Sequence, residues 1–156
     1  MSTDDLIASL CADGRVDSHG GFSLDPARAR EKLRTFQVAE PHRYALHLVA
    51  LAVLRVATAV AFEIDTDDLW ARFDGAPLTG QDFEDLYSSS FAAAQTDAER
   101  SRQQLAVGLN AALALNPRHA RVTSGPPGAR LRLEVRHGVE DAIAPVADAG
   151  AATEIH

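Results

Sequence analysis

The sequence predicts an α/β (α+β) fold: a two-layer sandwich in which helices cover one face of a mixed, mostly antiparallel sheet. Three observations predict it. Residues 41–56 are apolar on nearly all sides, which is typical of a central helix. Residues 59–65 and 69–73 alternate between apolar and polar side chains, and the short connection between them favours a hairpin. Residues 129–136 alternate in the same way, so the sheet continues in the second half of the chain.

Length and composition are those of one ordinary globular domain. The chain has 156 residues, of which 46% are hydrophobic and 24% charged. The net charge of −7 offers no basic surface for DNA or RNA, so we expect no nucleic-acid partner. Lysine occurs once, at Lys32, among 15 basic residues, which suggests a GC-rich genome and a bacterial source.

The cell compartment is predicted from the cysteine content and the apolar runs. Cys11 is the only cysteine, which fits a reducing compartment, and the acidic N-terminus does not resemble a secretory signal. The longest apolar run, 45–61, is interrupted by His47 and Arg55, so we expect no membrane span. These features favour a cytoplasmic location.

The N-terminal part is predicted to be a lead followed by the first elements of the domain. Residues 1–20 are interrupted by glycines and are interpreted as a loosely attached lead. Residues 21–25 alternate as a short strand. Asp25 and Pro26 then favour a helix start, and the helix ends before residue 41. The domain is therefore expected to span 21–156.

The middle of the chain contains a turn cluster between the hairpin and two further helices. Thr79, with Asp82 three residues later, predicts the cap of a helix over 81–88. Residues 88–102 show no fixed period and are interpreted as a mobile connection. A helix is expected only from 104 to 115, interrupted by a glycine and ended by Asn-Pro.

The C-terminal part is expected to complete the sheet. Residues 120–124 and 129–136 predict two strands. Residues 138–152 are rich in alanine, glycine and aspartate and are interpreted as a loop. Residues 153–156 look like the beginning of one more strand, so we expect a domain truncated at its C-terminal strand.

This order of elements resembles the GHKL superfamily, which includes gyrase-type ATPase domains, the ninety-kilodalton heat-shock chaperones, histidine kinases and mismatch-repair ATPases. The similarity covers about residues 21–156, and the chaperone branch is the most similar. It implies an ATP-binding fold with four sequence features, each of which can be compared with this chain.

The first feature that the resemblance implies is a helix with Glu-x-x-x-Asn, where Glu activates water and Asn holds Mg²⁺. Here His47 stands at the Glu position and Leu51 at the Asn position. Leu51 has no oxygen to offer a hard cation. His47 could act as a base in principle, but a partly buried helix histidine is the favoured interpretation.

The second implied feature is Asp-x-Gly-x-Gly after the second strand, where Asp accepts the adenine amino group. Phe73 stands at the Asp position, Gly75 is retained, and Pro77 replaces the second glycine. Asp74 could substitute after a shift of one residue, although such a shift turns a strand side chain to the other face. Leu78 follows in the same turn and would line the pocket.

The third and fourth features are a glycine-rich lid and a threonine near the base. Only Gly108 remains of the lid glycines, with Gln103 and Ala106 at the other places, and close helix packing explains a lone glycine equally well. Thr123 stands at the threonine position, where threonine is common for reasons of shape alone.

Other constellations point to no reaction. We find no cysteine–histidine set with metal spacing; His42, His47, His119 and His137 are dispersed along the chain. The predicted hairpin is acidic at residues 63–68 and could attract a cation, but a solvated turn is the more common explanation.

The sequence therefore predicts a non-catalytic GHKL-like domain that serves as a binding or interaction module of a larger protein. We expect no catalytic residue, no bound metal and no cofactor, and a protein partner or further domains of the same chain. The alternative is an ATP-binding protein or ATPase of this fold with a rearranged site that uses ATP and Mg²⁺. A third hypothesis is a purely structural piece whose missing C-terminal part carries the function. It predicts an exposed sheet edge near 153–156 and self-association in solution. The degenerate nucleotide pocket would consist of Leu51, Asp74, Gly75, Leu78, Gly108 and Thr123.

Overall fold

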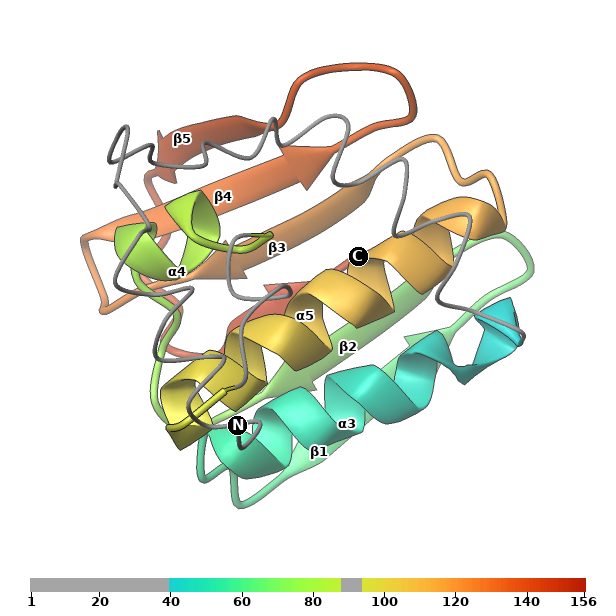
Figure 1. The fold of residues 1–156 in the computed structure, drawn as a ribbon. Helices are drawn as coiled ribbons and strands as arrows, with labels where there is room; N and C mark the ends of the chain where they lie inside the picture. The colour runs from blue at the N-terminus through green and yellow to red at the C-terminus, as the bar shows by residue number, and fades with distance from the viewer. Residues whose placement is uncertain (1–39, 88–93) are drawn as a thin grey trace, which may run out of the picture.

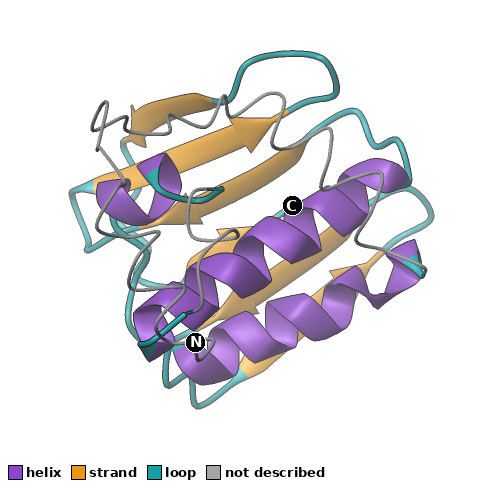
Figure 2. Cartoon of the chain, in the orientation of Figure 1, coloured by secondary structure: helices purple, strands orange, loops and turns teal. Residues whose placement is uncertain are grey.

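The computed structural model describes residues 40–87 and 94–156. In this part of the chain the helices lie on one face of a six-stranded sheet (Figures 1 and 2). The predicted two-layer α+β architecture is therefore confirmed. The predicted lead over 1–20 and the strand and helix over 21–40, except Glu40, lie outside the described residues.

The first described helix is the one predicted to be central. A 3₁₀ turn, η1 (Pro41–Arg43), leads directly into helix α3 (Tyr44–Leu54), with Pro41 at the first helical position. One side of α3 is buried through Leu48 and Leu51. The opposite side is not: Leu46 is 63% exposed within this structure, so the expectation of a helix covered on most sides is wrong.

The predicted hairpin is confirmed. Strands β1 (Val60–Ile64) and β2 (Leu69–Phe73) pair antiparallel, with Val60 opposite Phe73. Val60, which is half-buried, packs against the core, whereas Ile64 near the hairpin tip is 74% exposed. β1 is an edge strand of the described sheet, and its burial decreases from Val60 toward the hairpin tip.

Two helices follow the hairpin, and both begin with a capping box. Helix α4 (Gly80–Glu84) begins after Thr79, whose hydroxyl accepts from the backbone N–H of Asp82, as predicted. Helix α5 (Asp97–Ala114) begins earlier than expected. Thr96 and Glu99 form a second capping box, so part of the supposed connection over 88–102 is helical.

The second half of the sheet contains one strand that the sequence pattern did not predict. Strands β3 (Ala120–Ser124) and β4 (Arg130–Val135) form the expected pair. Strand β5 (Ala142–Val146) then pairs with β4 where a loop was expected. β5 contains Pro145, which lacks a backbone N–H, and an edge strand tolerates this because one side needs no partner.

The last strand occupies the middle of the sheet. Strand β6 (Thr153–Ile155) pairs with β2 on one side and β3 on the other, giving the order β1-β2-β6-β3-β4-β5. The expectation of an exposed edge at 153–156 is therefore wrong. All pairs among the described strands are antiparallel, so the expected mixed sheet is corrected to an antiparallel one.

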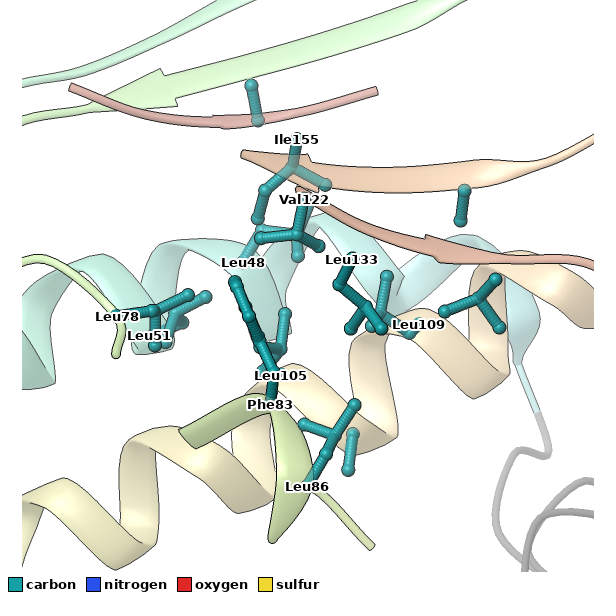
Figure 3. Close-up of a cluster of buried hydrophobic side chains, with 14 of the residues drawn as sticks. Leu48, Leu51, Leu78, Phe83, Leu86, Leu105, Leu109, Val122, Leu133 and Ile155 are labelled. Atoms are coloured by element: carbon teal, nitrogen blue, oxygen red, sulfur yellow. The ribbon is translucent and has the colours of Figure 1, made fainter. Parts of the chain in front are cut away.

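A single apolar core lies between the sheet and the helices (Figure 3). Helices α3 and α5 contribute Leu51 and Leu105, α4 contributes Phe83, and the sheet contributes Val122 and Ile155. None of the helices described is long and apolar enough to cross a membrane.

Candidate functional site

The helix position to which the GHKL resemblance would assign metal and water binding is apolar and buried. Leu51 is completely buried in the core beside Leu78 (Figure 3). His47, one turn earlier on α3, is half-buried, and its Nδ1 lies 2.8 Å from the Oε1 of Gln104 on α5. An amide therefore orients His47, and this pair joins α3 to α5.

Gly108 allows the two long helices to approach closely. A Cβ built at Gly108 would lie 3.2 Å from the Cβ of His47 and 3.3 Å from the Cδ2 of Leu48. These distances are tighter than most contacts of a real Cβ, so the glycine fits a close helix crossing. Helix packing explains Gly108 without any phosphate.

The turn after β2 presents apolar side chains to the core. Phe73 is 2% exposed and Leu78 is fully buried, and both belong to the same cluster as Leu51. At the position where the resemblance would place an adenine-binding aspartate there is thus a buried phenyl ring, which offers no hydrogen-bond acceptor. These three side chains fill the volume between α3 and the β2 turn with carbon.

Asp74 points to the chain segment that links α3 to β1. Its Oδ1 accepts from the backbone N–H groups of Thr58 at 2.7 Å and Ala59 at 2.9 Å, and its Oδ2 accepts from the Thr58 hydroxyl. The hydrogen bonds from the Thr58 hydroxyl and from Ala59 hold the pKa of the Asp74 carboxyl below its usual value. Asp74 thus fastens this turn with both carboxylate oxygens.

Gly75 belongs to the same turn, and the backbone conformation at this position requires a glycine. Its φ is +105°, and an added Cβ would lie 2.5 Å from the carbonyl oxygen of Arg55. That carbonyl accepts from the N–H of Ala76 at 2.8 Å. Gly75 therefore lets the turn after β2 contact the end of α3.

Thr123 lies on the other side of the sheet from these residues. Successive side chains of a strand point to opposite faces of the sheet, so Val122 and Ser124 point away from the face of Thr123. Val122 belongs to the core under the helices. The Thr123 hydroxyl accepts from the Nε of Arg132 at 3.3 Å. The structure thus brings Leu51, Leu78 and Gly108 to the helix side and leaves Thr123 on the opposite face.

The residue of β3 that does contact the β2 turn is Ser124. Its hydroxyl accepts from the backbone N–H of Leu78 at 2.8 Å and lies 2.7 Å from the hydroxyl of Thr153 on β6. All three residues are buried. Ser124 was not predicted from the sequence because the strand fits either register of the alternation.

A buried ion pair closes the space where α3, α4 and α5 meet. The Nη2 of Arg55 lies 3.0 Å from the Oδ1 of Asp82, with side chains 9% and 6% exposed. Arg55 also donates to Ser101, and Arg102 lies 3.4 Å from the same carboxylate oxygen. Burial pushes the pKa of Asp82 upward, but the hydrogen bonds from Thr79 and Arg55 and the charge of Arg55 outweigh it and hold the pKa below its usual value.

A groove opens at the end of the sheet, and of the six residues of the predicted nucleotide pocket only Gly108 lines it. It has a volume of about 890 Å³ and lies between the β1–β2 hairpin, the N-terminal half of α3 and the α5–β3 connection. Asp67, Asp68, His119 and His156 contribute polar groups to its wall, and Leu109 contributes to its apolar part.

Within this groove three side chains form a chain of polar contacts. The Nε2 of His156 lies 3.1 Å from the Oδ1 of Asp68, and its Nδ1 lies 3.5 Å from the Nε2 of His119. Residues 40–87 and 94–156 contain no group of three or more histidine, cysteine, aspartate and glutamate side chains that could hold a metal ion. In the sequence His119 looks isolated and His156 carries no signal, because the pair forms only when β3 and β6 become neighbours.

Comparison of the chain with protein-family models and with curated proteins gave no match. The resemblance to the GHKL superfamily accordingly rests on the order of elements and on the residues described above.

Proposed function

We propose that this chain is a non-catalytic GHKL-like domain that serves as a binding or interaction module and does not hydrolyse ATP. The observation that carries the proposal is the apolar packing of Leu51, Phe73 and Leu78, which are 0%, 2% and 0% exposed. In the resemblance, these positions surround the nucleotide. A hard cation needs oxygen ligands and adenine needs an acceptor, and these side chains supply neither.

The interaction role is supported by an apolar surface on the opposite side of α3. We call it the α3–β1 face: it comprises the exposed apolar side chains of helix α3, of the residues after it and of strand β1, namely Leu46, Val49, Val53, Val56, Phe62 and Ile64. Exposed apolar side chains that gather on neighbouring elements are typical of a contact with another protein segment. A partner protein or further residues of the same chain would bury it.

A titration followed by NMR tests whether ATP binds at the positions that the resemblance assigns to the nucleotide. The backbone amides of Gly75 and Gly108 lie where the resemblance places the nucleotide, so their signals report binding at that place. With millimolar ATP and Mg²⁺ we expect both signals to stay unchanged. Saturable shifts confined to these amides and their neighbours would contradict the proposal.

The alternative is an ATPase of the same fold with a rearranged site, in which Asp74 or His47 acts. It predicts phosphate release that is lost in Asp74→Ala or His47→Ala. We expect no release above background from the wild type, because both oxygens of Asp74 accept bonds from Thr58 and Ala59 and His47 is paired with Gln104. Phosphate release by the wild type that either variant abolishes would establish the alternative.

A further inference from the structure

Two histidines and one aspartate meet at one end of the sheet because of the strand order. Asp68 directly precedes β2, His119 directly precedes β3, and His156 directly follows β6. Strand β6 lies between β2 and β3 and is antiparallel to both. The beginnings of β2 and β3 and the end of β6 therefore share one end of the sheet, and this end borders the groove.

His156 is held in a defined orientation by its surroundings. Its ring stacks on Trp70, with the ring centres 3.9 Å apart and the planes 6° from parallel. Its backbone exchanges hydrogen bonds with Arg121 in both directions. Asp68 accepts the Nε2–H at 3.1 Å, and this contact leaves the lone pair on Nδ1. The side chain is 17% exposed, so it is fixed but still reachable from the groove.

The distance between the two imidazoles fits two ligands of one metal ion. The Nε2 of His119 and the Nδ1 of His156 lie 3.5 Å apart, and the ring centres lie 5.1 Å apart. Two nitrogens bound tetrahedrally to zinc at about 2.1 Å lie roughly 3.4 Å apart, with ring centres roughly 5 Å apart. A collinear N–H···N bond of the observed length would separate the ring centres by nearly 6 Å, so the two nitrogens are not aimed straight at each other.

We propose that His119 Nε2 and His156 Nδ1 form a two-ligand site for a divalent transition-metal ion of the zinc type. Asp68 positions His156 through the ring nitrogen that does not bind the ion, in the carboxylate–histidine arrangement common around zinc. The protein supplies two ligands, and water from the groove takes the remaining positions. This site is independent of the degenerate nucleotide pocket, so either proposal can fail alone.

The charges around the pair are compatible with a cation at neutral pH. Asp67 and Asp68 contribute two carboxylates to the same groove. The guanidinium of Arg121 is paired with Glu134 at 2.7 Å, and this pairing offsets the repulsion between Arg121 and a bound metal ion. Burial first, and then the charge of Arg121, lower the pKa of His119. Arg136 also faces His119 and also contacts Glu134.

Calorimetric titration of Zn²⁺ into the full chain, without a histidine tag, tests the site. We expect one ion per chain, with binding lost in His119→Ala and in His156→Ala. His119→Gln keeps a polar side chain without an imidazole and should lose binding too, which separates ligation from packing. Trp70 is the only tryptophan, so quenching of its emission by Cu²⁺ gives a second readout at the same place.

Matched controls separate ligation from charge and from other histidines. Asp68→Asn should weaken zinc binding about tenfold, the lower end of the effect of losing such an outer carboxylate. Asp67→Asn removes the same charge from the same groove and should leave the affinity within about twofold. His137→Ala removes an exposed histidine elsewhere and should change nothing.

The proposal is overturned if the wild type gives no binding heat, or if the three histidine variants at 119 and 156 bind zinc as tightly as the wild type. It is also overturned if Asp67→Asn weakens binding as much as Asp68→Asn, since charge alone would then explain the affinity. One ion per two chains would assign the ion to a contact between copies and would likewise overturn a site within one chain.

Discussion

At the scale of single residues, the backbone conformation and a close neighbour explain why position 75 is a glycine. Its φ of +105° and the distance of 2.5 Å from an added Cβ to the Arg55 carbonyl oxygen are two separate obstacles to any side chain. Gly128 has a φ of +82° but no atom within 4 Å of an added Cβ, so it presents only the first obstacle. A comparison of the same substitution at the two glycines therefore separates the effect of backbone strain from that of a steric clash.

We predict that Gly75→Ala lowers the free energy of unfolding by about 3 kcal/mol, because backbone strain and the clash with Arg55 add. Gly128→Ala should cost about 1 kcal/mol, from strain alone. Urea unfolding of both variants measures the difference. Equal losses in the two variants would mean that the β2 turn does not press against the end of α3.

The buried ion pair between Arg55 and Asp82 gives the second residue-scale prediction. Asp82→Asn should lower the free energy of unfolding by about 3 kcal/mol, because the guanidinium of Arg55 stays buried without its carboxylate. Asp97→Asn breaks a pair with Arg100 whose side chains are 68% and 55% exposed, and should cost at most about 0.5 kcal/mol. A loss in Asp82→Asn no larger than in this control would contradict the assigned role.

The same pair makes stability depend on pH with a definite sign. The pKa of Asp82 in the folded protein lies below its ordinary value of 3.8. Its contribution is therefore fully present above the unfolded pKa and is lost as the pH falls through the lower folded pKa. Denaturation profiles measured below pH 5 should fall less steeply in Asp82→Asn than in the wild type. Parallel profiles would show that another group governs this part of the acid unfolding.

At the scale of elements, the α3–β1 face shows how one helix can have two different sides. Leu48 and Leu51 are buried on one side of α3, whereas Leu46 and Val53 on the other are 63% and 66% exposed. The sequence could not distinguish the two sides because both are apolar. A helix that is apolar all round predicts burial on both sides, whereas the second side is exposed among the residues that the structure describes.

We predict that the double variant Leu46→Glu/Val53→Glu binds less of an apolar fluorescent dye than the wild type, while its helix content stays unchanged. Both side chains are mostly exposed, so charging them should not disturb the core. Val139→Glu alters an isolated apolar residue that is 55% exposed and serves as the control. Dye binding equal to wild type in the double variant would mean that the face is covered in the full chain.

Most elements were predictable where a capping residue or a proline marks the end of the element. Pro41 begins the first helical turn, and Thr79 caps α4, as their patterns indicated. The start of α5 was missed because Thr96 and Glu99 form their capping box inside a stretch without apolar period. Strand β5 was missed because Pro145 and its alanines carry little strand propensity, and pairing with β4 decides their conformation instead.

At the scale of the whole molecule, the short C-terminal strand holds the two halves of the sheet together. β6 is the only link between the β1–β2 hairpin and the β3–β5 strands in the described sheet. Ile155 is 4% exposed and lies opposite Ala71 on one side and Val122 on the other. Three residues at the end of the chain therefore join the sheet.

We predict that Ile155→Ala lowers the free energy of unfolding by about 3 kcal/mol, because it leaves a cavity at the centre of the sheet. Ile143→Ala makes the same change on the edge strand β5, where the side chain is 41% exposed, and should cost less than about 1.5 kcal/mol. Thermal or urea unfolding of the two variants measures this. A larger cost at Ile143 would contradict the central role of β6.

The candidate sites differ in how much of them a sequence can reveal. Leu51 and Phe73 could be identified as departures from a motif because each lies within a short local pattern. The groove residues Asp68, His119 and His156 could not, because they are far apart in the chain and only the strand order brings them together. Ser124 was missed for a third reason, since a shift of one residue along β3 exchanges the two faces.

The central proposal is that this domain binds no nucleotide, because apolar side chains occupy the positions that the GHKL resemblance assigns to nucleotide contacts. Calorimetric titration of ATP into the full chain, with and without Mg²⁺, tests it most directly. The packing of Leu51, Phe73 and Leu78 predicts no saturable heat in either titration up to millimolar ATP. Micromolar binding of ATP that depends on Mg²⁺ would contradict the account.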